Sequence, residues 1–94
     1  MIRFDCEALC CNDCGFNYLH QYKVEVFDRQ EDEKTGTHSI TTSGGVHVDH
    51  NMEGNPSSRR DGIRVFFNCE GCDKKQVLSI VQHKGMTYIE WEKK

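Results

Sequence analysis

The chain has 94 residues, of which 36% are apolar and 29% charged, so we expect one small domain over residues 1–94 with a modest core. No apolar run near the start could act as a signal peptide or cross a membrane, which predicts a cytoplasmic protein with reduced thiols. The net charge is −3, and the charges are unevenly distributed: residues 1–35 hold four basic and eight acidic side chains, whereas the C-terminal end is basic. A negative net charge argues against broad binding to a nucleic-acid backbone.

The first half of the chain predicts β-strands. Residues 16–28 alternate, with aromatic or aliphatic side chains at most even positions and polar ones at most odd positions, which is typical of a long strand. Residues 29–36 are charged and end on a glycine, so we expect a solvated loop. Residues 38–42 and 46–48 flank Ser43-Gly44-Gly45 and predict a hairpin, because glycine supplies the positive φ values of tight turns.

The second half continues the β pattern. Residues 51–62 contain the single proline and several turn formers, which predicts a second, longer loop. Further strands are expected at 63–68, 76–82 and 87–92, and a turn joins the last two. We therefore predict a mainly β protein, a small antiparallel sheet with an inserted β-hairpin and long loops.

Two C-x2-C steps carry the clearest chemical signal. The first consists of Cys11 and Cys14, and the second of Cys69 and Cys72. A two-residue gap lets the chain fold into a knuckle that directs both sulfurs at one ion, and four thiolates form a closed tetrahedral Zn²⁺ site. Gly15 follows the first step and relieves crowding where the chain leaves that knuckle. We predict one structural Zn²⁺ held by these four cysteines.

This arrangement resembles the zinc-ribbon family, in which two such knuckles join a small antiparallel sheet around one structural zinc. The resemblance covers Cys11 to Trp91, but the 54 residues between the knuckles exceed what many zinc ribbons use. Residues 28–62 are therefore expected to be an elaboration on the core. Residues 55–62 and 82–91 also make the chain similar to small zinc-ribbon proteins of unknown function encoded by bacteriophages and mobile elements.

The other candidate ligands leave alternatives open. Cys10 could replace Cys11 in a C-x3-C step, while Cys6 could form a redox pair or contribute to a second, partial site. Both could also be free thiols packed near the first knuckle. The segment His47-Val48-Asp49-His50 contains metal-binding residue types, but on a strand His50 points away from the other two. We do not expect a metal site there.

Enzyme activity is not expected. A site closed by four thiolates leaves no coordination position for water or substrate, and the sequence contains no phosphate-binding loop, nucleophile elbow or HExxH motif. We expect a non-enzymatic zinc-binding module without a small-molecule substrate or a membrane, which acts by binding a macromolecular partner.

The acidic net charge favours a protein partner. The resemblance to phage and mobile-element proteins implies one that binds and modulates a host protein complex in the host cytoplasm, as a regulator or counter-defence inhibitor. The acidic loop at residues 31–33 could occupy a surface meant for nucleic acid. Candidate aromatic anchors are Tyr18, Phe66, Tyr88 and Trp91, although most of them could equally be core residues.

The alternative is a nucleic-acid-binding zinc ribbon of a transcription-related type. Its basic surface would consist of Arg59, Arg60, Arg64, Lys74, Lys75 and Lys84, with an aromatic side chain available for base stacking. A homodimer through edge pairing is also open, because a small sheet leaves its edge strands unpaired.

Overall fold

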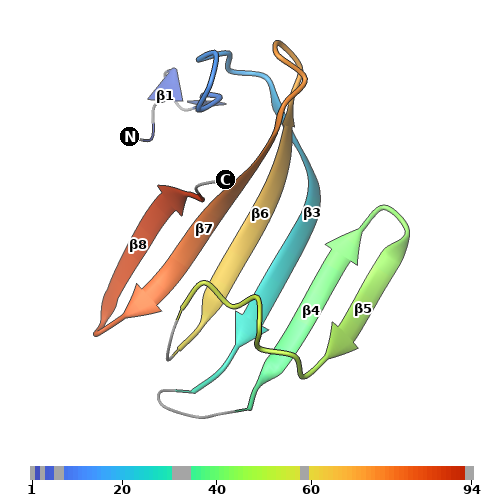
Figure 1. The fold of residues 1–94 in the computed structure, drawn as a ribbon, viewed down its shortest axis with the longest axis vertical. Coiled ribbons are helices and arrows are strands. Elements are labelled where there is room, and N and C mark those ends of the chain that lie inside the picture. Colours follow the sequence, from blue (N-terminus) through green and yellow to red (C-terminus); the bar gives the residue numbers. More distant parts are fainter. Residues whose placement is uncertain (1, 3, 6–7, 31–34, 58–59, 93–94) are drawn as a thin grey trace.

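The computed structural model describes residues 2, 4–5, 8–30, 35–57 and 60–92 (Figure 1). Within these ranges the chain forms strands and no helix, so the prediction of a mainly β protein is confirmed. No helix capable of crossing a membrane occurs among these residues. The strands are β1 (Phe4–Asp5), β2 (Ala8–Leu9), β3 (Leu19–Asp28), β4 (Thr37–Thr42), β5 (Gly45–Asp49), β6 (Gly62–Cys69), β7 (Lys75–His83) and β8 (Met86–Trp91).

Six of these strands form one antiparallel sheet in the order β5-β4-β3-β6-β7-β8, while β1 pairs only with β2. The predicted hairpin is present as β4 and β5, and it extends the sheet beyond β3. The central strands β3 and β6 are distant in sequence and pair from Leu19 opposite Cys69 to Phe27 opposite Gly62. This pairing places the start of β3 beside the end of β6, and so brings the two C-x2-C steps to the same end of the sheet.

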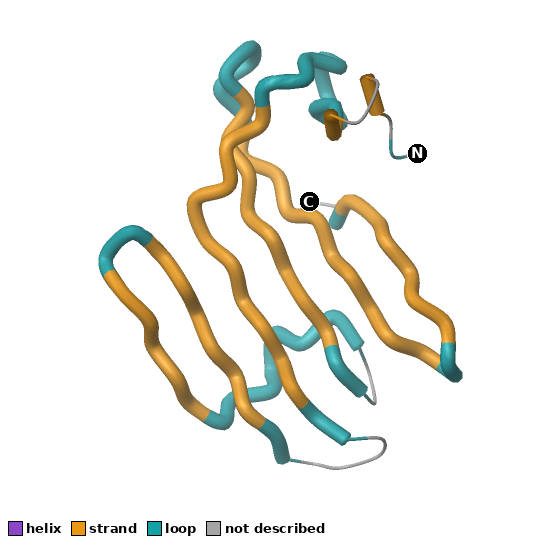
Figure 2. Tube along the Cα trace, turned by 180° about the vertical axis from the view of Figure 1, so that it is seen from behind, coloured by secondary structure: helices purple, strands orange, loops and turns teal. Residues whose placement is uncertain are grey.

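One side of the sheet, which we call the open face, carries two uncharged rows that cross all six strands. Residues directly opposite one another in antiparallel strands share a face, so the register defines the rows. The first row is Val46, Thr41, Val24, Val65, Leu78 and Trp91, and the second is Val48, Ser39, Val26, Ile63, Ile80 and Ile89. In the view from behind, the strands lie uncovered between their ends (Figure 2).

The other side, the covered face, lies beneath the loop that joins β5 to β6 (Figure 1). Gly54 of this loop lies over Phe27 and Arg64, and a Cβ placed on it would be 3.4 Å from the Phe27 ring. Phe27 is fully buried there and stacks on the His38 ring, with 4.4 Å between the ring centroids. The loop therefore buries a part of the sheet that is rich in polar side chains.

A chain of polar contacts crosses the covered face. His38 on β4 contacts Asp49 on β5 through Nδ1 (2.8 Å) and Glu25 on β3 through Nε2 (3.1 Å). Glu25 lies 3.7 Å from the guanidinium of Arg64 on β6, and Arg64 donates two hydrogen bonds to Glu92 after β8, at 2.8 and 2.9 Å. These contacts link β5, β4, β3 and β6 to the residue that follows β8.

The alternation in residues 16–28 predicts the strand but not the burial of its faces. Strand β3 begins at Leu19, three residues later than predicted, because the chain is still leaving the first knuckle. Val26, an even position, is 37% exposed on the open face, whereas the odd positions Glu25 and Phe27 are buried on the covered face. The loop at residues 50–61, not the local pattern, decides which face is buried.

The core is thin for the length of the chain. Apart from cysteines, the buried apolar side chains in the described ranges are Phe27, Phe66 and Leu78. The radius of gyration is 14.1 Å, whereas a compact domain of this length has about 12.4 Å. Both observations describe a single-layer sheet with one loop across one face.

The pair formed by Arg64 and Glu92 makes stability depend on pH. Burial opposes ionisation of Glu92, but hydrogen bonds from Arg64 and Ser79 outweigh it and lower the pKa of the carboxyl below its usual value of 4.5. The ionised group therefore stabilises the fold above that value, and the contribution is lost as the pH falls through the lowered pKa. We expect Glu92→Gln to melt below wild type at pH 7, with the difference narrowing below pH 4.5.

Differential scanning fluorimetry from pH 7 to pH 3 measures this difference. Glu90→Gln is the matched control, because Glu90 is an exposed glutamate two residues earlier, on β8, and the melting temperature of this variant should follow wild type throughout. A difference between Glu92→Gln and wild type that stays constant to pH 3 contradicts the role assigned to the pair.

Candidate metal centre

Four cysteine sulfurs lie together at the end of the sheet. Cys11 and Cys14 precede β3, Cys69 ends β6, and Cys72 lies in the turn before β7. The Sγ atoms of Cys11 and Cys72 are 3.7 Å apart, those of Cys14 and Cys69 are 3.5 Å apart, and all four lie within 4.8 Å of one another. A tetrahedral ion with metal–sulfur bonds of about 2.3 Å needs sulfurs about 3.8 Å apart. The arrangement is compatible with one bound metal ion.

The two C-x2-C steps adopt the same local conformation. In each, the N–H of the first cysteine donates to the carbonyl five residues later, and the N–H of the residue after the second cysteine donates back to the first cysteine's carbonyl, at 2.7–3.1 Å. That following residue has a positive φ in both steps, 76° at Gly15 and 59° at Asp73. The sequence argument explains Gly15, since glycine adopts this conformation without steric cost. At Asp73 the second knuckle imposes the same conformation on a residue with a side chain.

The surroundings of Cys11 favour its thiolate. Burial raises the pKa of this thiol, but hydrogen bonds from the Cys14 N–H, the Gln76 side chain and the Asp13 N–H outweigh burial and lower the pKa to about 6. Cys72 shows the opposite behaviour, because burial and its neighbouring sulfurs outweigh the Lys74 N–H and raise the pKa to about 12. Without a metal the Cys72 thiol therefore keeps its proton at neutral pH, so an ion that binds it as a thiolate must displace that proton.

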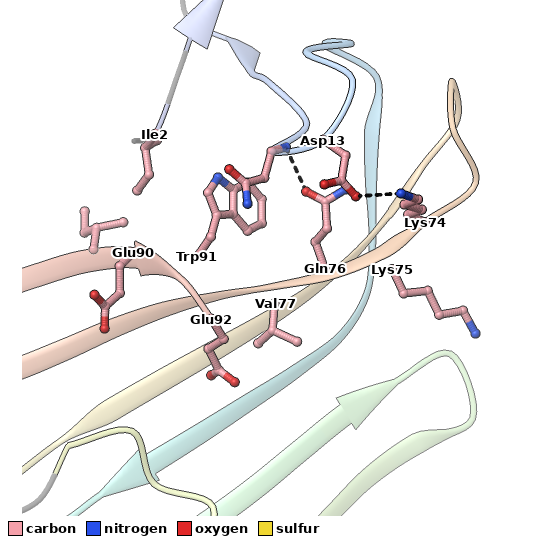
Figure 3. A pocket seen from close by; sticks show the side chains of 11 residues that line it. Ile2, Asp13, Lys74, Lys75, Gln76, Val77, Glu90, Trp91 and Glu92 are labelled. Carbon is pink, nitrogen blue, oxygen red and sulfur yellow. Dashed lines mark hydrogen bonds and ion pairs between the residues drawn. The ribbon is translucent and has the colours of Figure 1, made fainter. Parts of the chain in front are cut away.

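Gln76 on β7 connects the first knuckle to the sheet through hydrogen bonds (Figure 3). Its side-chain Nε2 donates to the Cys11 Sγ at 2.9 Å, and its Oε1 accepts a hydrogen bond from the Asn12 N–H at 2.9 Å. The Gln76 side chain is buried, and both ends of its amide are used. The sequence argument missed this residue, because the only local signal is a polar residue at the start of an apolar strand.

Cys10 lies apart from the four sulfurs. It is buried, and its Sγ lies 3.9 Å from the Ala8 carbonyl oxygen, outside the cluster. The first knuckle therefore uses Cys11, and the alternative C-x3-C step does not form. Every cysteine among the described residues is a free thiol. Cys6 lies outside the described residues, so its alternatives stay open.

The histidine segment has other contacts. His47 Nε2 lies 3.0 Å from Asp49 Oδ2, and His50 Nδ1 contacts the Gly36 carbonyl oxygen at 2.9 Å. His47 and Asp49 lie on the same face of β5, whereas His50 follows the end of the strand. Within the described ranges, the four-cysteine cluster is the only group of three or more residues with metal-ligand spacing.

The lysines proposed for a nucleic-acid surface lie at two ends of the sheet. Lys74 and Lys75 are exposed beside the second knuckle, and Lys74 forms an ion pair with Asp13 at 3.5 Å (Figure 3). Lys84 lies in the turn between β7 and β8, at the far end of the nine-residue strand β7. The structure does not bring these lysines together.

The arginines do not complete such a surface. Arg64 is on the covered face, where Glu92 holds its guanidinium and only 22% of its side chain is exposed. Arg60 lies just before β6 and is partly buried. Arg59 lies outside the described residues. The predicted six-residue basic surface is therefore not assembled from the residues that the structure places.

The aromatic candidates divide into buried and exposed residues. Phe66 is buried on the covered face, and Trp91 packs edge-on against Phe67, with 5.9 Å between the ring centroids. Tyr18 is 57% exposed beside the first knuckle, and Tyr88 is 48% exposed on the edge strand β8. Only the two tyrosines are available as surface anchors.

The contact between Gln76 and Cys11 should matter for metal affinity. Gln76→Glu replaces the N–H donor with a carboxylate facing a thiolate, so we expect Zn²⁺ affinity to fall about 10- to 100-fold. Competition with a chromophoric chelator measures this change. Gln82→Glu is the matched control, because Gln82 lies on the same strand and face but away from the sulfurs. Equal affinities for the two variants contradict the role of Gln76.

Comparison with protein-family models, curated proteins and solved structures gave no match. The function of the metal centre is therefore inferred from the arrangement of its own residues.

Proposed function

We propose that the four cysteines bind one Zn²⁺ and that the ion has a structural role. The observation that carries this proposal is the closed set of four sulfurs within 4.8 Å of one another. Soft thiolates in a tetrahedral arrangement suit Zn²⁺, which has no preferred geometry of its own and no redox chemistry. The first knuckle precedes the sheet in sequence, so the ion would fasten the N-terminal segment to the end of β6 and to the turn before β7.

A closed site supports a non-enzymatic role. Four protein sulfurs occupy every position of a tetrahedral ion, so neither water nor a substrate can bind the metal. Binding of the ion would then contribute to folding free energy, which a protein with so thin a core needs. The protein would act by what its surface binds.

The metal end carries a surface suited to binding another protein. Tyr18 is 57% and Phe16 38% exposed, and their rings lie 5.1 Å apart. Phe16 packs on Gly71 in the second knuckle, where any side chain would clash with the ring. The knuckles therefore hold a rigid pair of exposed aromatic rings, which are common anchors of protein interfaces. We call Phe16 and Tyr18 the aromatic pair.

We take the partner to be a protein in a host complex, which this chain binds and modulates. The acidic net charge supports a protein over a nucleic acid. The resemblance to small zinc-ribbon proteins of phages and mobile elements supports a host complex, in the host cytoplasm, as the target.

One observation favours nucleic acid as the second candidate. The ammonium of Lys75 lies 5.5 Å from the ring centre of Tyr22, which is 42% exposed, and Lys74 is its neighbour in sequence. Lysines beside an exposed ring are the pattern of single-strand binding by base stacking. This small patch replaces the six-residue basic surface that the sequence predicts.

The metal is tested by native mass spectrometry of protein purified without added metal. Wild type and Cys10→Ser should each carry one Zn²⁺, whereas Cys11→Ser should lose it, because Cys10 lies outside the cluster. Elemental analysis of the same samples distinguishes Zn²⁺ from iron, which four thiolates also bind. Iron, no metal, or loss of the ion in Cys10→Ser contradicts the assignment.

The partner surface is tested with Tyr18→Ala. A nuclease-treated lysate of a bacterial host is passed over immobilised protein, and we expect a bound host protein that Tyr18→Ala releases. Tyr88→Ala is the control, because Tyr88 is a similarly exposed tyrosine on the edge strand β8. Fluorescence anisotropy with a labelled single-stranded oligonucleotide tests the second candidate. Binding that weakens steeply as salt rises favours nucleic acid and contradicts a protein partner.

A further inference from the structure

The open face leaves a six-stranded sheet without a second layer in the described ranges. Its two rows hold ten apolar residues and two small polar ones, and several side chains are strongly exposed, including Val48 at 58% and Ile89 at 53%. A sheet is stable in water when at least one face is packed against another layer. Here the loop covers the opposite, polar side, and Ile2 and the first knuckle line a pocket with Ile89 and Trp91 at the β8 end of the aliphatic side. The rest of the aliphatic side has no covering layer among the described residues.

We propose that the open face packs against the open face of a second copy of this chain, which gives a two-layer β-sandwich. Two such sheets would lie about 10 Å apart with their inner side chains interdigitated. The interface would be isologous, because the same surface contributes from both copies. The covered face with its loop then lies on the outside of each layer.

The distribution of charge favours a second copy as the occupant. A two-fold axis brings the residues near the axis close to their own equivalents, so a charge at the centre of the face would meet a like charge. Neither row contains a charged residue, although the chain as a whole carries −3. Most charges of the central strands lie on the covered face, in the chain from Asp49 to Glu92, and Asp28 lies at the end of β3 beyond the two rows. The open face is therefore compatible with itself.

The area of the open face determines how strong the dimer is expected to be. Six strands spaced about 4.8 Å apart and two rows of residues cover roughly 400 Å² of the sheet plane, so two copies would bury roughly 800–1,000 Å². This value lies below the roughly 1,200–2,000 Å² of stable specific interfaces, which predicts a weak, reversible dimer.

This inference does not rest on the proposed function. The aromatic pair and the four cysteines contribute no residue to the two rows. A protein that binds no Zn²⁺ or no host partner could still dimerise through the open face, and the reverse also holds. The experiments on dimerisation and those on the proposed function can therefore contradict one proposal without contradicting the other.

Analytical ultracentrifugation of the wild-type protein from about 1 to 100 μM tests the proposal. We expect the mass to rise from the 10.9 kDa of one chain toward twice that value. Ile89→Glu and Val26→Glu place like charges at the two-fold interface and should weaken dimerisation at least about 100-fold. Tyr88→Glu is the matched control, because Tyr88 is the neighbour of Ile89, is 48% exposed and points to the opposite face. It should dimerise like wild type.

Val26 separates this dimer from one made by edge pairing. It lies on β3, an interior strand, so a dimer joined through the edges β5 or β8 would not be affected by its substitution. Val26→Thr has nearly the same shape and should weaken the dimer about 10-fold even if the glutamate variants do not fold. A wild-type monomer at 100 μM, or a dimer that Val26→Thr leaves unchanged, overturns the proposal.

Discussion

The convergence of two C-x2-C steps on one point is the constraint on which the rest of the structure depends. The pairing of β3 with β6 brings the steps together, and a metal ion between four sulfurs would in turn fix that pairing at its end. The thin core gives this coupling its importance, because Phe27, Phe66 and Leu78 are few buried side chains for so long a chain. We therefore regard the metal centre as part of the fold and not as an addition to it.

The two faces of the sheet differ in chemistry: one affects the stability of the fold, and the other affects what the sheet can pack against. The covered face uses hydrogen-bonded charges beneath a loop, so its stability depends on keeping every partner in place. Asp49 shows this, because hydrogen bonds from the Asn51 N–H and from His38 lower the pKa of its carboxyl. The open face uses uncharged aliphatic side chains, and their exposure is the reason to infer a second layer. The metal end carries the aromatic pair and is joined to the sheet through Gln76.

Local patterns in the sequence predicted the elements well. The four cysteines, the hairpin around Gly44, and the strands at the C-terminal end are all determined by spacing, glycine and alternation, which act within a few residues. The residue types in these segments therefore indicate the local structure directly. The mainly β class follows from the same patterns.

Features that depend on long-range register could not be predicted. Gln76 reaches Cys11 across 65 positions, and nothing in its neighbourhood marks it as a partner of a thiolate. The sequence alone predicts Arg64 to be a surface cation. In the structure it lies under a loop and donates hydrogen bonds to Glu92. The burial of Glu25 beside His38 likewise depends on where the loop at residues 50–61 crosses the sheet.

X-ray absorption spectroscopy of the protein as purified tests the central claim most directly, because it reads the atoms around the bound ion. The account predicts a zinc edge and four sulfur neighbours at about 2.3 Å, with no nitrogen or oxygen neighbour in the first coordination sphere. A spectrum with histidine nitrogen or water oxygen bound to the metal would contradict it, since the site would then be open and the fold would be held in another way.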